Sequence, residues 1–158
     1  MMVVSDTSPI TTLLKVDRAH LLHDMFGTVV VPQGVADELR AFHSDLPEFV
    51  EVRARAESEV RLPGTESLGR GEAEAIRLAK ELNAELLWTD DRKARVAAER
   101  LGIPCAGLVA LAVRAKQSGK LASVRELVMS WEQHGSFHLS DAVRLEALRL
   151  AGEEPPAS

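Results

Sequence analysis

Short apolar runs alternate along the chain with longer segments in which apolar residues recur every three or four positions. The runs at residues 2–5, 28–31 and 86–88 have the length and composition of buried strands. The longer segments have the period of amphipathic helices. Strands that alternate with helices form a parallel sheet covered on both faces. The pattern therefore predicts an α/β protein with three α/β/α layers and a mainly parallel central sheet.

The remaining elements follow from caps and breakers. Residues 49–53 alternate and are compatible with an edge strand, and residues 103–107 predict one more short strand. Two helices follow the α/β part as a C-terminal extension, and the second is expected to be capped by Ser140. The helices expected from caps and periodicity span residues 9–14, 18–26, 32–42, 72–83, 92–101, 108–117, 124–134 and 141–151.

The overall composition limits the class of protein. The 158 residues suit a single domain, which we place at 1–152 with a disordered tail at 153–158. No apolar run is long enough to span a membrane, and the N-terminus lacks the features of a signal peptide. With Cys105 as the only cysteine, no internal disulfide forms, so we expect a cytoplasmic protein.

The net charge of -5 argues against a simple basic DNA-binding domain. It does not argue against an enzyme whose active site is itself a cluster of carboxylates. Such a site raises the acidic count and requires metal ions before it accepts a phosphodiester.

Carboxylates follow two of the expected strands directly. Asp6 ends the first strand, and the doublet Asp90 and Asp91 follows residues 86–88. The carboxyl ends of parallel strands lie at one edge of the sheet, which is where open α/β sheets bind ligands. Isolated, each of these acids is explained equally well as a helix cap.

Two more carboxylates are expected to face inward from helices. Glu38 lies on or beside the stripe formed by Val35, Leu39 and Phe42. Glu72 lies on the apolar side of its helix and in the first turn, where the helix dipole favours a negative charge.

Carboxylates that converge on one place repel each other unless cations neutralise them, and oxygen ligands suit Mg²⁺ or Mn²⁺. Such a metal site activates water and neutralises a phosphodiester. Cations next to the doublet would hold the nucleic-acid backbone, although a solvated helix face explains them as well. They are Arg92, Lys93 and Arg95.

Four segments in this order resemble the PIN-domain nucleases, especially the toxins of VapBC-type toxin–antitoxin pairs and a subgroup described as predicted nucleic-acid-binding proteins. The segments are residues 3–9, 31–39, 71–76 and 89–92. The resemblance implies a metal-dependent ribonuclease that acts on RNA, forms homodimers and is inhibited by a partner antitoxin.

The resemblance also implies roles for individual residues. Asp6, Glu38 and Glu72 match the first three acids of the family, and Glu72 replaces a residue that is commonly Asp. Either Asp90 or Asp91 fills the fourth position, and the usual Thr-x-Asp spacing favours Asp91. The catalytic set is then Asp6, Glu38, Glu72 and Asp91, the metal ligands are Asp6, Glu72, Asp90 and Asp91, and Ser8 and Thr89 support them.

Two other functions remain in view. The negative charge and the Glu at the third position are compatible with a non-catalytic nucleic-acid-binding or regulatory module on the same fold. A phosphohydrolase acting on small molecules needs a second Asp two residues after its nucleophile. Ser8 occupies that position after Asp6, which argues against this function.

Overall fold

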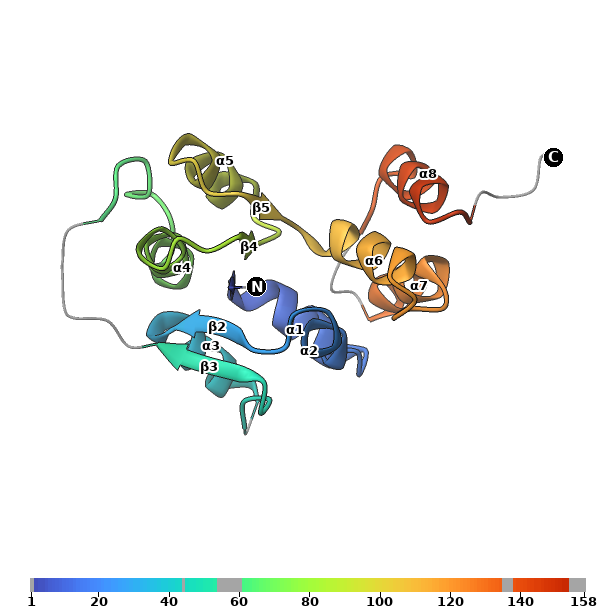
Figure 1. Ribbon diagram of the computed structural model, residues 1–158, viewed down its shortest axis with the longest axis horizontal. Helices are drawn as coiled ribbons and strands as arrows, with labels where there is room; N and C mark the ends of the chain where they lie inside the picture. The colour runs from blue at the N-terminus through green and yellow to red at the C-terminus, as the bar shows by residue number, and fades with distance from the viewer. Residues whose placement is uncertain (1, 44, 54–60, 135–137, 154–158) are drawn as a thin grey trace.

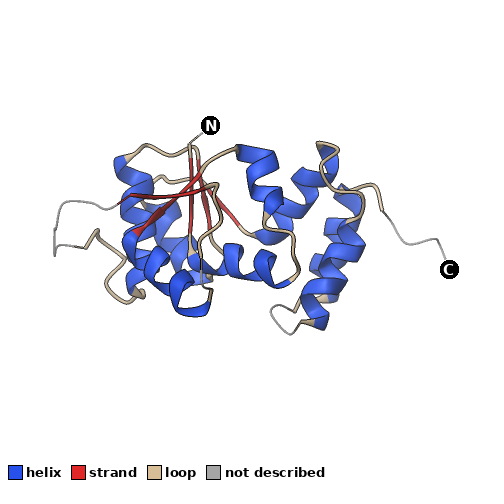
Figure 2. Cartoon of the chain, turned by 90° about the horizontal axis from the view of Figure 1, so that it is seen from below, coloured by secondary structure: helices blue, strands red, loops and turns tan. Residues whose placement is uncertain are grey.

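The computed structural model describes residues 2–43, 45–53, 61–134 and 138–153. Five parallel strands form one sheet in the order β3-β2-β1-β4-β5, which confirms the predicted α/β fold with a parallel sheet. Helices flank the sheet, and a C-terminal group of helices extends beyond its β5 edge (Figures 1 and 2). The strands are β1 (Val3–Ser5), β2 (Val29–Pro32), β3 (Val50–Arg53), β4 (Leu86–Trp88) and β5 (Cys105–Ala106).

The helices agree closely with the periodic segments of the sequence. The apolar period continues almost to each helix end, where a cap or a glycine stops it. They are α1 (Thr7–Lys15), α2 (His20–Phe26), α3 (Gln33–Phe42), α4 (Arg70–Glu81), α5 (Arg92–Arg100), α6 (Leu108–Gln117), α7 (Val124–Gln133) and α8 (Asp141–Leu150).

The central strands are buried on both faces, which explains their continuous apolar sequences. In the β1–β4 ladder Val3 lies opposite Leu86 and Ser5 opposite Trp88. The ladder continues one step further, because the Asp6 N–H donates to the Trp88 carbonyl at 2.9 Å. This register sets Asp6 beside Thr89 at the carboxyl edge of the sheet.

Three local expectations were wrong. Ser8 before Pro9 predicts a helix capped by Ser8, but Asp6 caps α1 instead. Phe42 is 78% exposed, because α3 ends there and the buried stripe stops at Leu39. Glu153, expected in the tail, accepts hydrogen bonds from the backbone N–H groups of Val124 and Arg125 at 2.7 and 3.2 Å. The rest of the expected tail, residues 154–158, lies outside the described residues.

Candidate active site

Asp6 and Thr89 form the centre of the candidate site. Asp6 is only 5% exposed, and its Oδ1 accepts the Thr7 N–H at 2.7 Å. Its Oδ2 accepts a hydrogen bond from the Thr89 hydroxyl at 3.1 Å, and the Thr89 oxygen in turn accepts the Asp91 N–H at 3.2 Å. One buried threonine therefore connects the acid after β1 to the acid after β4.

Asp91 is held by the start of α5. It is the N-cap of that helix, and its Oδ1 accepts the Lys93 N–H at 3.2 Å. The cap fixes the carboxylate at the sheet edge, on the side of Asp6. Asp91 is thus both a helix cap and a candidate site residue, the two roles that the sequence left as alternatives.

Glu38 reaches the cluster from α3. Its Oε2 accepts a hydrogen bond from the Thr7 hydroxyl at 2.6 Å, although the residue as a whole is exposed. Its Oε1 lies 2.7 Å from the place that a Cβ on Gly71 would occupy. Glycine at position 71 therefore allows α4 to approach this carboxylate closely, which any larger residue would obstruct.

Glu72 enters from the first turn of α4. Its Oε2 accepts the Gly69 N–H at 3.1 Å, so the side chain folds back over the start of its own helix. The carboxyl is half-buried, and the neighbouring Asp91 is among the causes that raise its pKa.

The electrostatics of the cluster penalise its negative charges. Burial, together with the charges of Glu38 and Asp91, raises the pKa of Asp6 to about 6 despite the lowering effect of its hydrogen bonds to Thr7 and Thr89. Burial also raises the pKa of Glu72, and Asp6 and Asp91 add to the effect. A cation among these groups would remove the penalty.

The cluster fits a hard divalent cation by its donor chemistry, since Asp6, Glu38, Glu72 and Asp91 offer only carboxylate oxygens. Hydrogen bonds from Thr7, Thr89, Gly69 and Lys93 orient one or more oxygens of each acid. Within the described residues, however, no three His, Cys, Asp or Glu side chains already surround one point as metal ligands. The acids interact electrostatically, but joint ligation of one ion would require their carboxylates to come closer together.

Asp90 lies apart from this cluster. Its Oδ1 accepts the Leu108 N–H at 2.8 Å, at the start of α6. Burial raises its pKa, and the Leu108 N–H and the charge of Arg95 lower it; none of the cluster acids is among the causes. A Cβ on Gly107 would stand 2.5 Å from this oxygen. The structure gives Asp90 a structural role between β4 and α6, and we leave it out of the proposed metal set.

The three cations that follow the doublet do not lie on one surface. Arg92 and Lys93 are exposed in the first turn of α5, beside Asp91. Arg95 is half-buried and lines a groove with Asp90 and Cys105.

Thr7, and not the expected Ser8, contacts the acids of the cluster. Ser8 is exposed in the first turn of α1, whereas its neighbour Thr7 holds both Asp6 and Glu38. Thr7 and Gly71 were missed as site residues. Both stand in the segments that resemble the PIN family, but only the approach of α3 and α4 to α1 shows what they contact.

Comparison with known families decides the identity of the fold. A family model described as DUF3368, PIN domain, matches residues 2–153. The chain belongs to the PIN-domain family. Proteins of this family are often nucleases and typically bind divalent metals. The match also includes the two C-terminal helices, which the sequence resemblance did not reach.

A solved structure of a PilT N-terminus domain protein from the hyperthermophilic archaeon Sulfolobus solfataricus has the same fold. It is 22% identical, has a TM-score of 0.53, and the alignment covers 89% of this chain and 99% of that one. At this identity the likeness concerns the fold alone. A search of curated proteins found no match. Within the described part of this PIN domain, no helix has the length and apolarity needed to cross a bilayer.

Proposed function

We propose that this PIN domain is a divalent-metal-dependent endoribonuclease that hydrolyses RNA phosphodiester bonds. The observation that carries the proposal is the cluster itself. Asp6, Glu38, Glu72 and Asp91 come from four different elements and still interact electrostatically at the carboxyl edge of the sheet. Perturbed carboxylates gathered at such an edge are typical of functional sites rather than of structural ion pairs.

Each residue of the cluster would have a distinct role in this reaction. Asp6, Glu72 and Asp91 would hold Mg²⁺ or Mn²⁺, which when bound lowers the pKa of water and neutralises phosphate charge. Thr89 fixes the two strand-end acids relative to each other through its hydroxyl. Thr7 orients Glu38, whose exposed carboxylate is placed to accept a proton from water beside the cluster. Arg92 and Lys93 would contact the RNA backbone.

The test is cleavage of a labelled RNA in the presence of Mn²⁺. We expect Asp6→Asn and Asp91→Asn each to reduce the rate by about 100-fold or more, the scale of a missing catalytic group. Asp24→Asn, an exposed acid on α2, is the matched control and should retain the wild-type rate. Equal rates in all four proteins would overturn the proposal. A DNA of the same sequence tests the preference for RNA.

A second function is favoured by two observations, Glu72 at a position that is commonly Asp in the family and the absence of a finished metal-ligand set among the described residues. It is a non-catalytic nucleic-acid-binding or regulatory module. This reading predicts RNA binding without cleavage and the same affinity with and without Mn²⁺. The cleavage assay separates the two functions directly.

The narrower biological role that we propose is that of a toxin-like homodimer inhibited by an antitoxin protein, and the resemblance of its motifs supports it. Expression in a bacterial host should arrest growth, and Asp6→Asn should relieve the arrest. Light scattering of the purified protein measures its oligomeric state. Growth unaffected by an active nuclease would contradict the toxin role and leave the enzyme assignment standing.

A further inference from the structure

A large groove separates the edge of the sheet from the last helix. It has a volume of about 940 Å³, and its lining residues include members of α5, β5, α6 and α8. Figure 1 shows how these elements are arranged. We call this cavity the β5–α8 groove, and its walls include Arg95, Cys105, Val109, Arg114, Val143 and Leu150. Val143 and Leu150 are 44% and 47% exposed, so the wall formed by α8 is apolar and open.

The groove begins next to the carboxylate cluster. Asp90 lines its end, and the following residue, Asp91, belongs to the cluster. Arg95 stands one turn beyond Asp91 on the same helix. An RNA strand with one phosphate at the cluster would therefore enter the groove if it extended toward β5.

Two arginines in the groove are available for a ligand. Within the described residues, neither Arg95 nor Arg114 has a carboxylate at ion-pair distance. The Arg114 guanidinium carbon lies 5.9 Å from the centre of the Trp88 ring, which holds it near the end of β4. The nearby acids are already engaged, Asp90 by the Leu108 N–H and Glu146 by Arg149.

On the opposite flank of the cluster, the arginines of α4 already have carboxylate partners. Arg70 is ion-paired with Asp37 at 3.0 Å and lies 3.5 Å from Glu74, and Arg77 is paired with Glu81 at 3.7 Å. A polyanion gains little from arginines that already have carboxylate partners. The charges therefore favour exit of the strand toward α5 and α6.

We propose that the β5–α8 groove binds the single-stranded RNA segment that extends from the carboxylate cluster. Arg95 and Arg114 contact its phosphates, and the apolar wall of Val109, Val143 and Leu150 contacts its bases. Single strands are commonly held by such a combination of cations and base contacts. The inference rests on the proposed nuclease function, and it adds a binding site that the C-terminal helix creates.

The first experiment measures RNA affinity without cleavage. A fluorescein-labelled single-stranded RNA is titrated, with Mn²⁺ present, into Asp91→Asn protein and into the same protein with Arg95→Ala and Arg114→Ala. Losing two phosphate contacts should make the plot of log affinity against log salt shallower by about 1.4, because each contact to a single strand contributes about 0.7. Lys15→Ala with Arg18→Ala removes the same charge from an exposed site outside the groove and should leave the slope unchanged.

The second experiment locates the strand. Cys105 is the only cysteine and lines the groove, so an azidophenacyl group attached there is a photo-crosslinker at a single known position. We expect illumination to cross-link the RNA, and an excess of unlabelled RNA to suppress the product. The Arg95→Ala, Arg114→Ala protein should give less product at the same RNA concentration.

The outcomes distinguish this proposal from the nuclease function. An unchanged salt slope together with no cross-link would overturn the groove proposal even if the protein cleaves RNA. A shallower slope with a cross-link supports it even if no cleavage occurs. A third outcome, in which Val143→Asp and Leu150→Asp convert a larger species into monomers, would show that a second protein chain covers the groove and would also overturn it.

Discussion

The carboxylates of the cluster and those of the C-terminal helices lie in opposite electrostatic surroundings. In the cluster, burial and neighbouring acids raise the pKa of Asp6 and Glu72. Around α7 and α8, hydrogen bonds from Arg144 hold the pKa of Glu132 below its usual range. For Glu153, burial opposes the shift, but hydrogen bonds from Val124, Arg125 and Ser123 prevail and lower the pKa.

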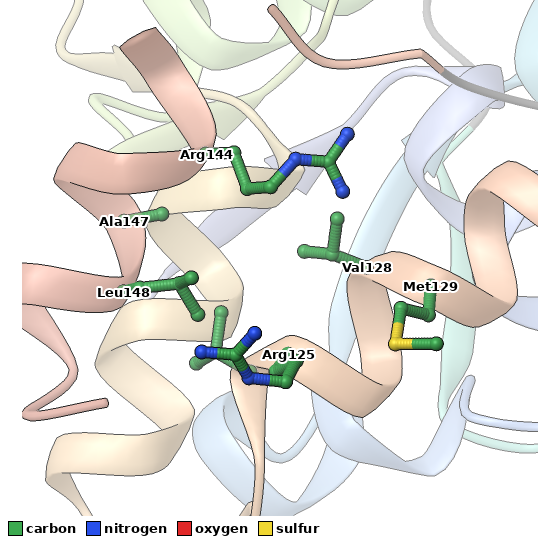
Figure 3. A pocket seen from close by; sticks show the side chains of 7 residues that line it. Arg125, Val128, Met129, Arg144, Ala147 and Leu148 are labelled. Carbon is green, nitrogen blue, oxygen red and sulfur yellow. The ribbon is translucent and has the colours of Figure 1, made fainter. Parts of the chain in front are cut away.

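In the C-terminal region, charged side chains have hydrogen-bond partners within the fold. Arg144 binds Glu132 through two hydrogen bonds of 2.5 and 2.8 Å. Figure 3 shows Arg144 and Arg125 at a small pocket of about 80 Å³ between α7 and α8. Arg125 donates to the Glu153 carbonyl at 3.3 Å. The charge of Arg144 is therefore balanced by a carboxylate within the fold, whereas Arg125 has a neutral carbonyl as its partner.

The comparison indicates that the carboxylate cluster, and not the C-terminal region, lowers the stability of the fold. Every described acid of the C-terminal helices with a shifted pKa is stabilised in its charged form. For Asp6 and Glu72 in the cluster the charged form is disfavoured, and a bound cation would offset this penalty. Such unfavourable placement is typical of sites kept for function, at a cost in stability.

The largest expected effect is stabilisation by metal. Mn²⁺ at about 100 times its Kd should stabilise the wild type by about 2.7 kcal/mol, which raises Tm by about 5–10 °C in a chain of this size. Calorimetry with increasing Mn²⁺ measures the shift. Asp6→Asn and Asp91→Asn should abolish most of it, whereas Glu153→Gln should retain it. The same shift in all these proteins would place the metal elsewhere.

The next effect is a pH dependence from Asp6. Since its pKa in the folded protein is about 6, above its usual value of 3.8, the stability linked to this group is present at low pH and is lost as pH rises through 6. Without metal, unfolding by urea should become easier by about 1–1.5 kcal/mol between pH 5 and 7.5.

The Asp6→Asn protein is the reference for this measurement, because histidines titrate in the same range. The difference between the two stability curves isolates Asp6. Asp6→Asn should also be the more stable protein at pH 7.5 without metal. A flat difference curve would show that the aspartate is ionised at no cost, and the contrast between the two regions would disappear.

The smallest effect concerns Glu153. Its carboxylate accepts the Val124 N–H at 2.7 Å and lies 3.5 Å from the Lys116 ammonium, so it caps α7 from beyond the end of α8. Glu153→Ala should reduce stability by about 1 kcal/mol, as for a lost helix cap, and leave RNA cleavage unchanged. Because the pKa of Glu153 is lowered, its contribution is present near neutral pH and is lost as pH falls through the folded pKa. Urea unfolding at pH 7 and pH 3 tests both statements.

The sequence by itself determined the fold class and most of the cluster. Strand and helix periods are local properties, so residues 86–88 and 108–117 were predicted at their observed bounds. Acids that follow parallel strands reach the same sheet edge, which places Asp6 and the Asp90–Asp91 doublet there without knowledge of the packing. The match to the PIN family confirms the recognition made from the motifs.

Only the tertiary structure separated the two acids of the doublet. Asp90 and Asp91 are adjacent and chemically identical, and the first turns toward the start of α6 because the Leu108 N–H, eighteen residues away, needs an acceptor there. Thr7 holds Glu38 across thirty-one residues, a contact that no local period encodes. The groove beside α8 likewise exists only because α6 and α8 pack together beyond β5. Local patterns follow from backbone geometry, whereas these contacts depend on how distant elements approach each other.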